Sequence, residues 1–306
     1  MKKPVLGGSD LAAPKHQQNW DWRAATNFIV GGAGGALLLF AAMGGFEAAA
    51  TRTAILLALV LIGCGLTCVW FEIGRPWRAL NVYRHFASSW MTREAVVALM
   101  VFAAGGLALL LLWPLLVWLS AAAGLAFLYS QARILAANKG IPAWRHPRSV
   151  YLMVVTGLTE GAGLLACVAS LSASPIGFWH LAGLLALIAI RAFIWKGYLA
   201  GLTADGAPEA SLRVLNGIDT KLLVLGHVLP GLAVAAALAG MPGRGVWLFA
   251  AGIMVVASGW LLKYTLVRRA AFTQGLALLR LPVRGGGPAG PATKPGWKSL
   301  QDAKAG

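Results

Sequence analysis

The sequence predicts an all-α fold, a polytopic membrane protein built as a bundle of eight transmembrane helices, and three observations lead to this prediction. Of the 306 residues, 58% are hydrophobic and only 12% are charged, whereas soluble domains carry about a quarter charged residues. Apolar runs long enough to cross a bilayer, which takes about 20 residues, recur along the chain. The runs lack the alternation of membrane β-strands, so helices are expected, because in lipid the backbone must satisfy its own hydrogen bonds.

The spans can be placed in chain order from these apolar runs. Residues 1–23 are polar, and the first apolar run has no cleavage site behind it, so it is expected to be a retained span. Only Trp113-Pro114 separates the third span from the fourth, which makes seven spans the competing count. The basic tail 268–306 is rich in Gly, Pro and Lys and is expected to be disordered. The membrane domain 24–267 is expected to hold spans near 24–46, 53–73, 95–112, 115–136, 150–171, 177–199, 218–239 and 246–267.

Basic residues sort by loop and orient the chain. In an eight-span arrangement, all of the 26 lysines and arginines except Arg52 and Arg244 are assigned to one side. The positive-inside rule places that side, with both termini, in the cytoplasm of a bacterial inner membrane. A seven-span chain would split the basic segments between both faces, so the charge pattern favours eight. The net charge of +16 is spread over short loops without a nucleic-acid motif, so contact with the lipid bilayer explains it and no nucleic-acid partner is expected.

The stretch from Glu72 to Ala95, EIGRPWRALNVYRHFASSWMTREA, interrupts the apolar sequence with arginines, tryptophans and carboxylates. It resembles the membrane-anchor subunits of the NrfD/DmsC/PsrC superfamily, which connect molybdenum–iron–sulfur oxidoreductases to the quinone pool. The N-terminal WDWRAATNFIVGGAGG is similar to the first span of that family, and eight spans in 306 residues agree with its DmsC-like branch. The segment QQNWDWRAATNF also resembles the anchors of phenylacetyl-CoA:acceptor oxidoreductases. The residues that match the family's loop pattern are Gly74, Pro76, Arg78, Ala79, Ser89, Thr92, Arg93 and Glu94.

The resemblance implies a quinone/quinol-reactive anchor subunit that is not catalytic on its own. Its expected partners are an iron–sulfur, ferredoxin-like subunit and a molybdopterin catalytic subunit, and iron–sulfur clusters and molybdopterin are expected only in those partners. The resemblance assigns quinol handling to Arg78 and Glu94. It assigns the same role to a position where the family has histidine and this chain has Glu72.

The chemistry of this stretch agrees with a quinone site. Quinone reduction takes up two electrons and two protons, so its site needs a proton-exchanging group, a polar anchor and an apolar groove. Glu94 and Glu72 are expected to approach each other at one membrane boundary, where neighbouring carboxylates favour proton exchange. An interfacial loop with an aromatic belt is the alternative. The expected quinone-binding side chains are Arg78, Arg75, Trp77 and, from the first span, Asn27.

Two ionisable residues, Glu160 and His227, are expected near the middle of the bilayer. A charged group at that depth is costly, and it usually pairs or lines a polar cavity. Glu160 and His227 are therefore candidates for a proton route. A structural cluster in which Glu160 pairs with Arg191 or Lys221 is the alternative, and the sequence leaves both open.

Neither haem nor a bound metal is expected. His180 begins its span and His227 is central in another, so the two do not form the matched pair that a b-type haem needs. Cys64, Cys68 and Cys167 lie in apolar spans and are expected to pack, because three thiols cannot hold a four-cysteine iron–sulfur cluster. A secondary transporter and a purely structural anchor without a quinone site are the competing functions. The sequence shows no internal repeat of the kind that favours a transporter.

Overall fold

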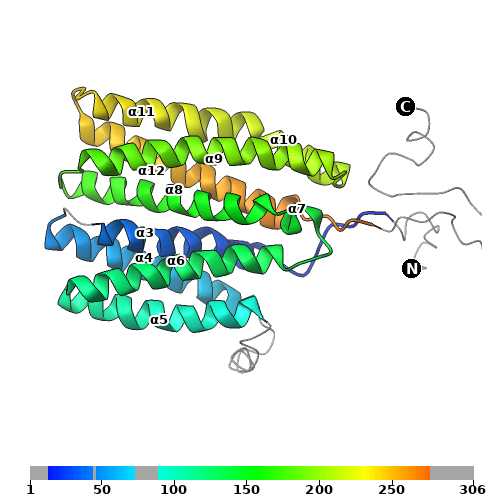
Figure 1. The fold of residues 1–306 in the computed structure, drawn as a ribbon, viewed down its shortest axis with the longest axis horizontal. Coiled ribbons are helices and arrows are strands. Elements are labelled where there is room, and N and C mark those ends of the chain that lie inside the picture. The colour runs from blue at the N-terminus through cyan, green and yellow to red at the C-terminus, as the bar shows by residue number, and fades with distance from the viewer. Residues whose placement is uncertain (1–12, 44–45, 73–88, 276–306) are drawn as a thin grey trace, which may run out of the picture.

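The structure, a computed structural model, describes residues 13–43, 46–72 and 89–275, which form a bundle of long helices (Figure 1). Eight helical spans among these residues are long and apolar enough to cross a membrane. The described part of the chain contains no β-strand. The predicted all-α, eight-span bundle is therefore confirmed, and the seven-span alternative is wrong.

Among the described residues, three spans contain a π-helical turn, in which each backbone hydrogen bond reaches one residue further along the chain than in an α-helix. The first span consists of α2, η1 and α3, the seventh of α10, η3 and α11, and the eighth of α12 and η4. The elements in chain order are α2 (Trp22–Thr26), η1 (Asn27–Gly31), α3 (Gly32–Ala42), α4 (Ala48–Glu72), α5 (Trp90–Leu111), α6 (Pro114–Ala136), α7 (Pro142–Arg145), α8 (Arg148–Leu171), α9 (Phe178–Ala204), α10 (Glu209–Lys221), η3 (Leu222–Val228), α11 (Leu229–Leu238), α12 (Arg244–Tyr264) and η4 (Thr265–Arg269).

Local capping explains where the helices begin and end. The side chain of Ser89 accepts a hydrogen bond from the Thr92 N–H at 3.4 Å, so α5 begins at Trp90, before the predicted residue 95. This places Glu94 one turn inside the helix. At the other end of α5, Leu112 adopts a left-handed conformation with φ 50° and Pro114 opens α6, which together form the tight turn predicted at Trp113-Pro114.

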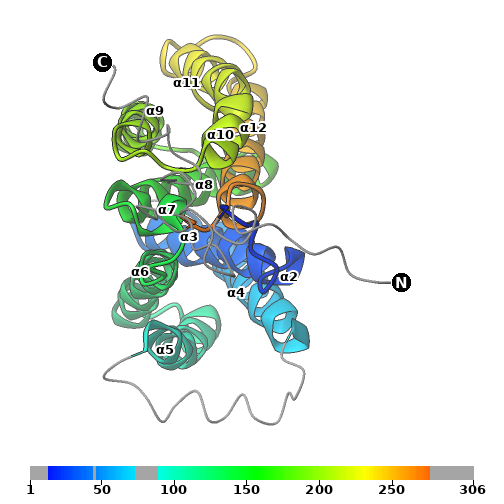
Figure 2. The ribbon, with the colours of Figure 1, turned by 90° about the vertical axis from the view of Figure 1, so that its right-hand side faces the viewer.

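The bundle consists of two groups of four spans that meet through α3 and α8. The span containing α3 packs against α4, α6 and α8, whereas α8 also packs against α9 and α12. In the first and the fifth span, 83% of an 18-residue apolar stretch is buried inside the protein. The corresponding share is 28% in α4, α5 and α9. Seen along the bundle, α5 and α11 lie at opposite edges and α3 and α8 between them (Figure 2). The central pair is therefore shielded by the other helices.

Glycines allow the central helices to approach closely. A Cβ atom added to Gly34 would lie 2.7 Å from the carbonyl oxygen of Ala58, and one added to Gly35 would lie 2.6 Å from that of Gly124. Small residues are the usual means of close contact between membrane helices, because lipid gives them little hydrophobic reason to associate.

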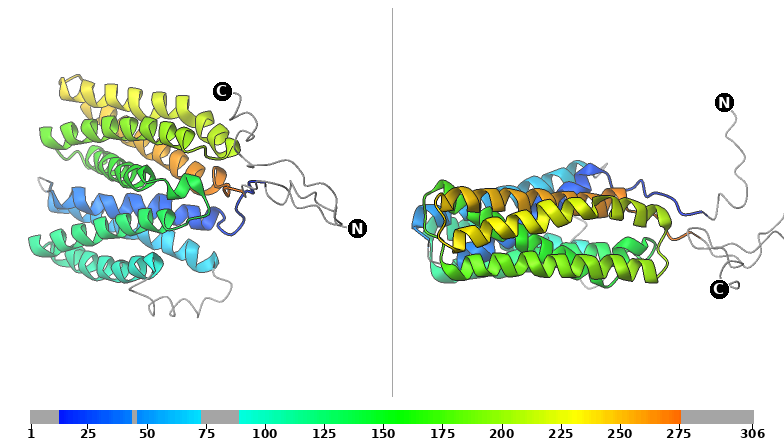
Figure 3. Two further views of the ribbon diagram at one scale, coloured as in Figure 1. Left: turned by 45° about the vertical axis from the view of Figure 1, so that its right-hand side comes forward. Right: turned by 90° about the horizontal axis from the view of Figure 1, so that it is seen from above.

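Both ends of the described chain lie at the same end of the bundle, here called the proximal end (Figure 3). Residues 13–21 run beside residues 270–275, where the Gln17 N–H donates to the Ala271 carbonyl at 2.9 Å. At the opposite, distal end, Arg52 donates to the carbonyl of Leu109 at 3.2 Å and Arg244 donates to that of Ile176 at 2.7 Å. Arg52 and Arg244, the two basic residues that were not assigned to the cytoplasmic side, thus donate to backbone oxygens.

Candidate functional site

Glu94 and Asn27, which belong to two separate sequence motifs, meet inside the bundle. Glu94 lies one turn into α5 with 7% of its surface exposed, and Asn27 opens η1 with 3% exposed. The Asn27 side-chain Nδ2 donates to Glu94 Oε1 at 3.0 Å. The structure therefore brings together one of the expected catalytic residues and one of the expected quinone ligands.

The backbone of η1 is held in place from two sides. Gly65 of α4 faces Asn27, since a Cβ atom at this glycine would lie 2.9 Å from Asn27 Oδ1 and 3.1 Å from its Cα. From α6, the fully buried Gln131 donates its Nε2 to the carbonyl oxygen of Asn27 at 2.9 Å. Sequence reasoning missed Gln131, although a lone amide inside an apolar span is the signal that could have identified it.

Two buried acceptor oxygens of the residues that hold Asn27 and Glu94 lack a donor. Neither Asn27 Oδ1 nor Gln131 Oε1 has a hydrogen-bond partner among the described residues. Buried polar atoms of this kind are normally satisfied by protein, water or ligand. A hydroxyl group, such as that of a quinol, or a water molecule supplies the donor that both oxygens lack, so the residues present fit such a ligand.

Glu72 lies elsewhere, at the end of α4 and half-buried. Its Oε1 accepts the backbone N–H of Asp21 at 3.3 Å, and Arg23 donates to the Phe71 carbonyl at 2.7 Å. Glu72 is two turns beyond Gly65, about 10 Å further along the helix. In the described contacts Glu72 and Glu94 bind different parts of the N-terminal region, and the expected approach of the two carboxylates stays a prediction.

Asp21 connects this contact to the start of the first span. It forms an ion pair with Arg23 at 2.8 Å, and the hydrogen bond from Arg23 holds the pKa of Asp21 below its usual value. The predicted ligands Arg75, Trp77 and Arg78 lie outside the described residues. Their relation to Glu72 and Glu94 stays a prediction.

An aromatic and basic cluster stands beside Glu94 at the proximal end of α5. The guanidinium carbon of Arg93 lies 4.3 Å from the Trp90 ring centroid, and that of Arg133 lies 4.9 Å from it. Tyr129 packs edge-on against Trp90. Cation–π contacts of this kind stabilise arginines at a boundary between apolar and polar surroundings.

Glu160 forms an ion pair with Lys263, and both side chains are fully buried. Glu160 Oε2 and Lys263 Nζ are 2.5 Å apart, and Lys263 also donates to the Ile29 carbonyl in η1 at 3.3 Å. Glu160 therefore pairs with a cation, as in the structural alternative, but the partner is Lys263 and not Arg191 or Lys221. Lys263, which was counted with the basic residues of the cytoplasmic side, lies buried inside α12 and is the partner of Glu160, while Lys221 is exposed.

Arg191 is fully buried at the middle of α9 and binds neutral groups. It donates to the Gly226 carbonyl, to the Val255 carbonyl at 3.2 Å and to Ser258 Oγ at 3.2 Å. His227 follows Gly226 in η3, is 7% exposed, and has no hydrogen-bond partner for either ring nitrogen among the described residues. Arg191 therefore links α9 to η3 and α12.

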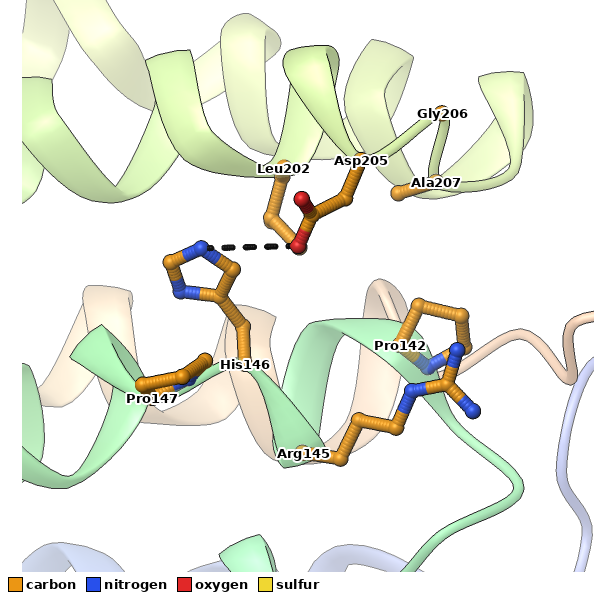
Figure 4. Close-up of a pocket in the computed structure, with 8 residues that line it drawn as sticks. All are labelled: Pro142, Arg145, His146, Pro147, Leu202, Asp205, Gly206 and Ala207. Carbon is orange, nitrogen blue, oxygen red and sulfur yellow. Dashed lines mark ion pairs between the residues drawn. The ribbon is translucent and has the colours of Figure 1, made fainter.

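A separate surface pocket of about 140 Å³ opens at the proximal end between α7 and the turn from α9 to α10 (Figure 4). His146 Nε2 faces Asp205 Oδ2 across it at 3.8 Å, and His146 Nδ1 accepts the Arg148 N–H at 3.2 Å. Burial lowers the pKa of His146. None of the residues that line this pocket belongs to the Glu94 cluster, so it is a different feature. In the described part of the chain, no group of three His, Cys, Asp or Glu side chains is placed to hold a metal ion.

The comparisons with known proteins agree with the architecture. The family model described as DMSO reductase anchor subunit (DmsC) matches residues 27–200, more than half of the chain, from Asn27 to the second half of α9. No curated protein matches the chain in a sequence search. A match of this length, together with eight apolar spans, identifies the family. The chain belongs to the DmsC family of DMSO reductase anchor subunits and is a membrane anchor subunit of a molybdoenzyme complex.

Proposed function

We propose that this anchor is also the quinone-reactive subunit of its complex, passing electrons between the quinone pool and an iron–sulfur partner. The observation that carries the proposal is the buried hydrogen bond from Asn27 to Glu94 at 3.0 Å. Burying a carboxyl group inside a membrane span is energetically costly. Such residues are therefore rare in membrane spans, and where they occur they usually mark a functional site.

The residues of this cluster supply the parts that the reaction needs. Glu94 exchanges a proton, Asn27 holds the carboxyl group in place, and the free side-chain oxygen of Asn27 binds a hydroxyl hydrogen. Bound quinol supplies the two electrons and two protons of the reaction. Arg78, Arg75 and Trp77 are proposed as ligands of its polar head, and Glu72 as a group that exchanges protons with the solvent at the membrane boundary.

The proposed electron partner docks at the proximal end. Exposed basic side chains gather there, among them Lys15, Lys139 and Arg145. An acidic ferredoxin-like subunit would be steered towards such a surface, and the molybdopterin subunit would attach through it. By the positive-inside rule this end faces the cytoplasm of a bacterial inner membrane. The catalytic partner then acts on an intracellular substrate, for which a phenylacetyl-CoA:acceptor oxidoreductase is our specific proposal.

Substitution of Glu94 by Gln tests the quinone role, because it keeps the shape of the side chain and removes the titrating group. Membranes carrying the variant should retain the catalytic subunit and its activity with a soluble dye. Their quinone-linked turnover should fall by roughly one to three orders of magnitude, in line with the loss of acid–base catalysis. Glu209→Gln is the matched control, since Glu209 is an exposed residue paired with Arg213. Full quinone turnover in Glu94→Gln would leave a purely structural anchor.

A further inference from the structure

Glu94 alone cannot hold both protons of a quinol, and the structure contains a second titratable centre joined to it through η1. Two side chains from different helices donate to carbonyl oxygens of this one π-helical turn. Gln131 of α6 donates to Asn27 at 2.9 Å, and Lys263 of α12 donates to Ile29 at 3.3 Å. The turn thus lies between the Glu94 cluster and the ion pair of Lys263 with Glu160.

Gln131 and Lys263 also face the same point at Gly32. A Cβ atom added to this glycine would lie 3.0 Å from Gln131 Oε1 and 2.9 Å from Lys263 Nζ. The two atoms are therefore no more than about 6 Å apart, a gap that one bridging water closes. A side chain larger than glycine at position 32 would press on both of these polar atoms.

Residues of the ion pair of Glu160 with Lys263, and residues close to them in sequence, carry buried polar atoms without a hydrogen-bond partner. Glu160 Oε1, Thr156 Oγ1 and Thr265 Oγ1 are buried and have no hydrogen-bond partner among the described residues, as is the case for Gln131 Oε1. Thr156 stands one helical turn before Glu160 in α8, and Thr265 follows Lys263 by two residues. Buried water is retained in proteins where several such groups surround it.

The charges of the cluster indicate which group can exchange a proton. Arg191 donates to Ser258 at 3.2 Å, and the neighbouring Gly259 faces Glu160, whose carboxyl carbon would lie 2.8 Å from a Cβ atom there. One carboxylate thus stands beside two buried cations. A guanidinium group does not release its proton in proteins, whereas a buried lysine amine does so readily. Charge balance in this buried cluster is therefore reached when Lys263 is a neutral amine, which can accept a proton.

We propose that Lys263 is the second proton acceptor of the Glu94 site, reached through water held beside Gln131. The inference rests on the proposed quinone function. For each quinol oxidised, the Glu94 carboxylate takes one proton, the Lys263 amine takes the other, and two electrons leave to the iron–sulfur partner. Glu160 holds the resulting ammonium group. In quinone reduction the same two groups return their protons.

Lys263→Arg tests this role in the purified complex, because arginine preserves the positive charge and the bond to Glu160 but does not release a proton. We expect the variant to assemble and its turnover with a short-chain naphthoquinol to fall at least about tenfold. Lys196→Arg is the matched control, since Lys196 forms an exposed ion pair with Asp219 at 2.6 Å, and it should keep wild-type turnover. A high-resolution cryo-EM map of the wild-type complex should show water between Gln131 and Lys263.

If Lys263→Arg does not assemble, Gln131→Met tests the same proton transfer. It removes the oxygen that would bind the bridging water and leaves the ion pair of Lys263 with Glu160 unchanged. It should slow quinol turnover by a similar factor. Wild-type turnover in whichever of these variants assembles, or a map without water between the two side chains, would overturn the inference. If Glu94→Gln is impaired while these variants are not, only the role of Lys263 fails. If Glu94→Gln is fully active, the proposed function itself fails.

Discussion

The side-chain amide of Asn27 donates to the carboxyl group of Glu94 at 3.0 Å and joins the first membrane span to the third. A hydrogen bond to a charged group contributes about 1.5–3 kcal/mol. Asn27→Leu should therefore lower quinone-linked turnover roughly ten- to a hundredfold while the complex still assembles. Dye-linked and quinone-linked assays on the same membranes separate the two effects. Asn138→Leu, at an exposed turn, is the control, and equal turnover in both variants would contradict a role for the amide.

The close approach of α4 to Asn27 depends on Gly65. Gly65→Ala would place a Cβ atom 2.9 Å from Asn27 Oδ1, whereas Gly63→Ala would meet nothing nearer than Phe102 at 3.7 Å. Overpacking of this kind costs about 1–3 kcal/mol. We expect Gly65→Ala to displace η1, to lower the thermal unfolding temperature and to reduce quinone turnover, while Gly63→Ala behaves as wild type. Identical unfolding temperatures for the two variants would show that η1 tolerates the added methyl group.

The amino-acid sequence predicted part of this arrangement, for physical reasons that differ from residue to residue. Asn27 and Glu94 stand out because polar groups are rare in apolar runs. Lys263 was counted with the cytoplasmic charges because it lies near the end of its predicted span, and only the packing of α12 shows that it is buried. Gln131 carries no charge and drew no attention. The π-helical turns shift hydrogen bonds by one residue without changing the apolar composition, so no pattern predicted them.

Reporter fusions test the orientation of the bundle. Arg148 opens α8 at the proximal end, while Gly240 lies in the distal turn between α11 and α12. If the proximal end is cytoplasmic, alkaline phosphatase should be inactive when fused after Arg148 or after Lys294, and active when fused after Gly240, because the enzyme folds only after export. Activity at Arg148 with none at Gly240 would reverse the orientation.

Acid should loosen the proximal pocket through His146. Burial holds the pKa of His146 below its ordinary value of 6.5 in the folded protein, so its contribution to stability is present above that value and is lost as the pH falls. Asp205 opposes this shift, since its carboxylate raises the pKa of His146. Asp205→Asn should therefore make thermal stability more acid-sensitive as the pH falls below about 6.5, and His146→Gln less so. Parallel stability curves for both variants and the wild type would contradict the assignment.

Arg191 ties α9 to η3 and α12 through a side chain that is fully buried, and its removal should affect stability more than chemistry. Arg191→Leu leaves the carbonyls of Gly226 and Val255 without their donor, and each unsatisfied buried group costs about 1–3 kcal/mol. Arg213→Leu breaks an exposed pair with Glu209, which contributes at most about 1 kcal/mol. The purified complex carrying Arg191→Leu should thus unfold at a clearly lower temperature than the one carrying Arg213→Leu. Equal unfolding temperatures would mean that water replaces Arg191 as the donor to these carbonyls.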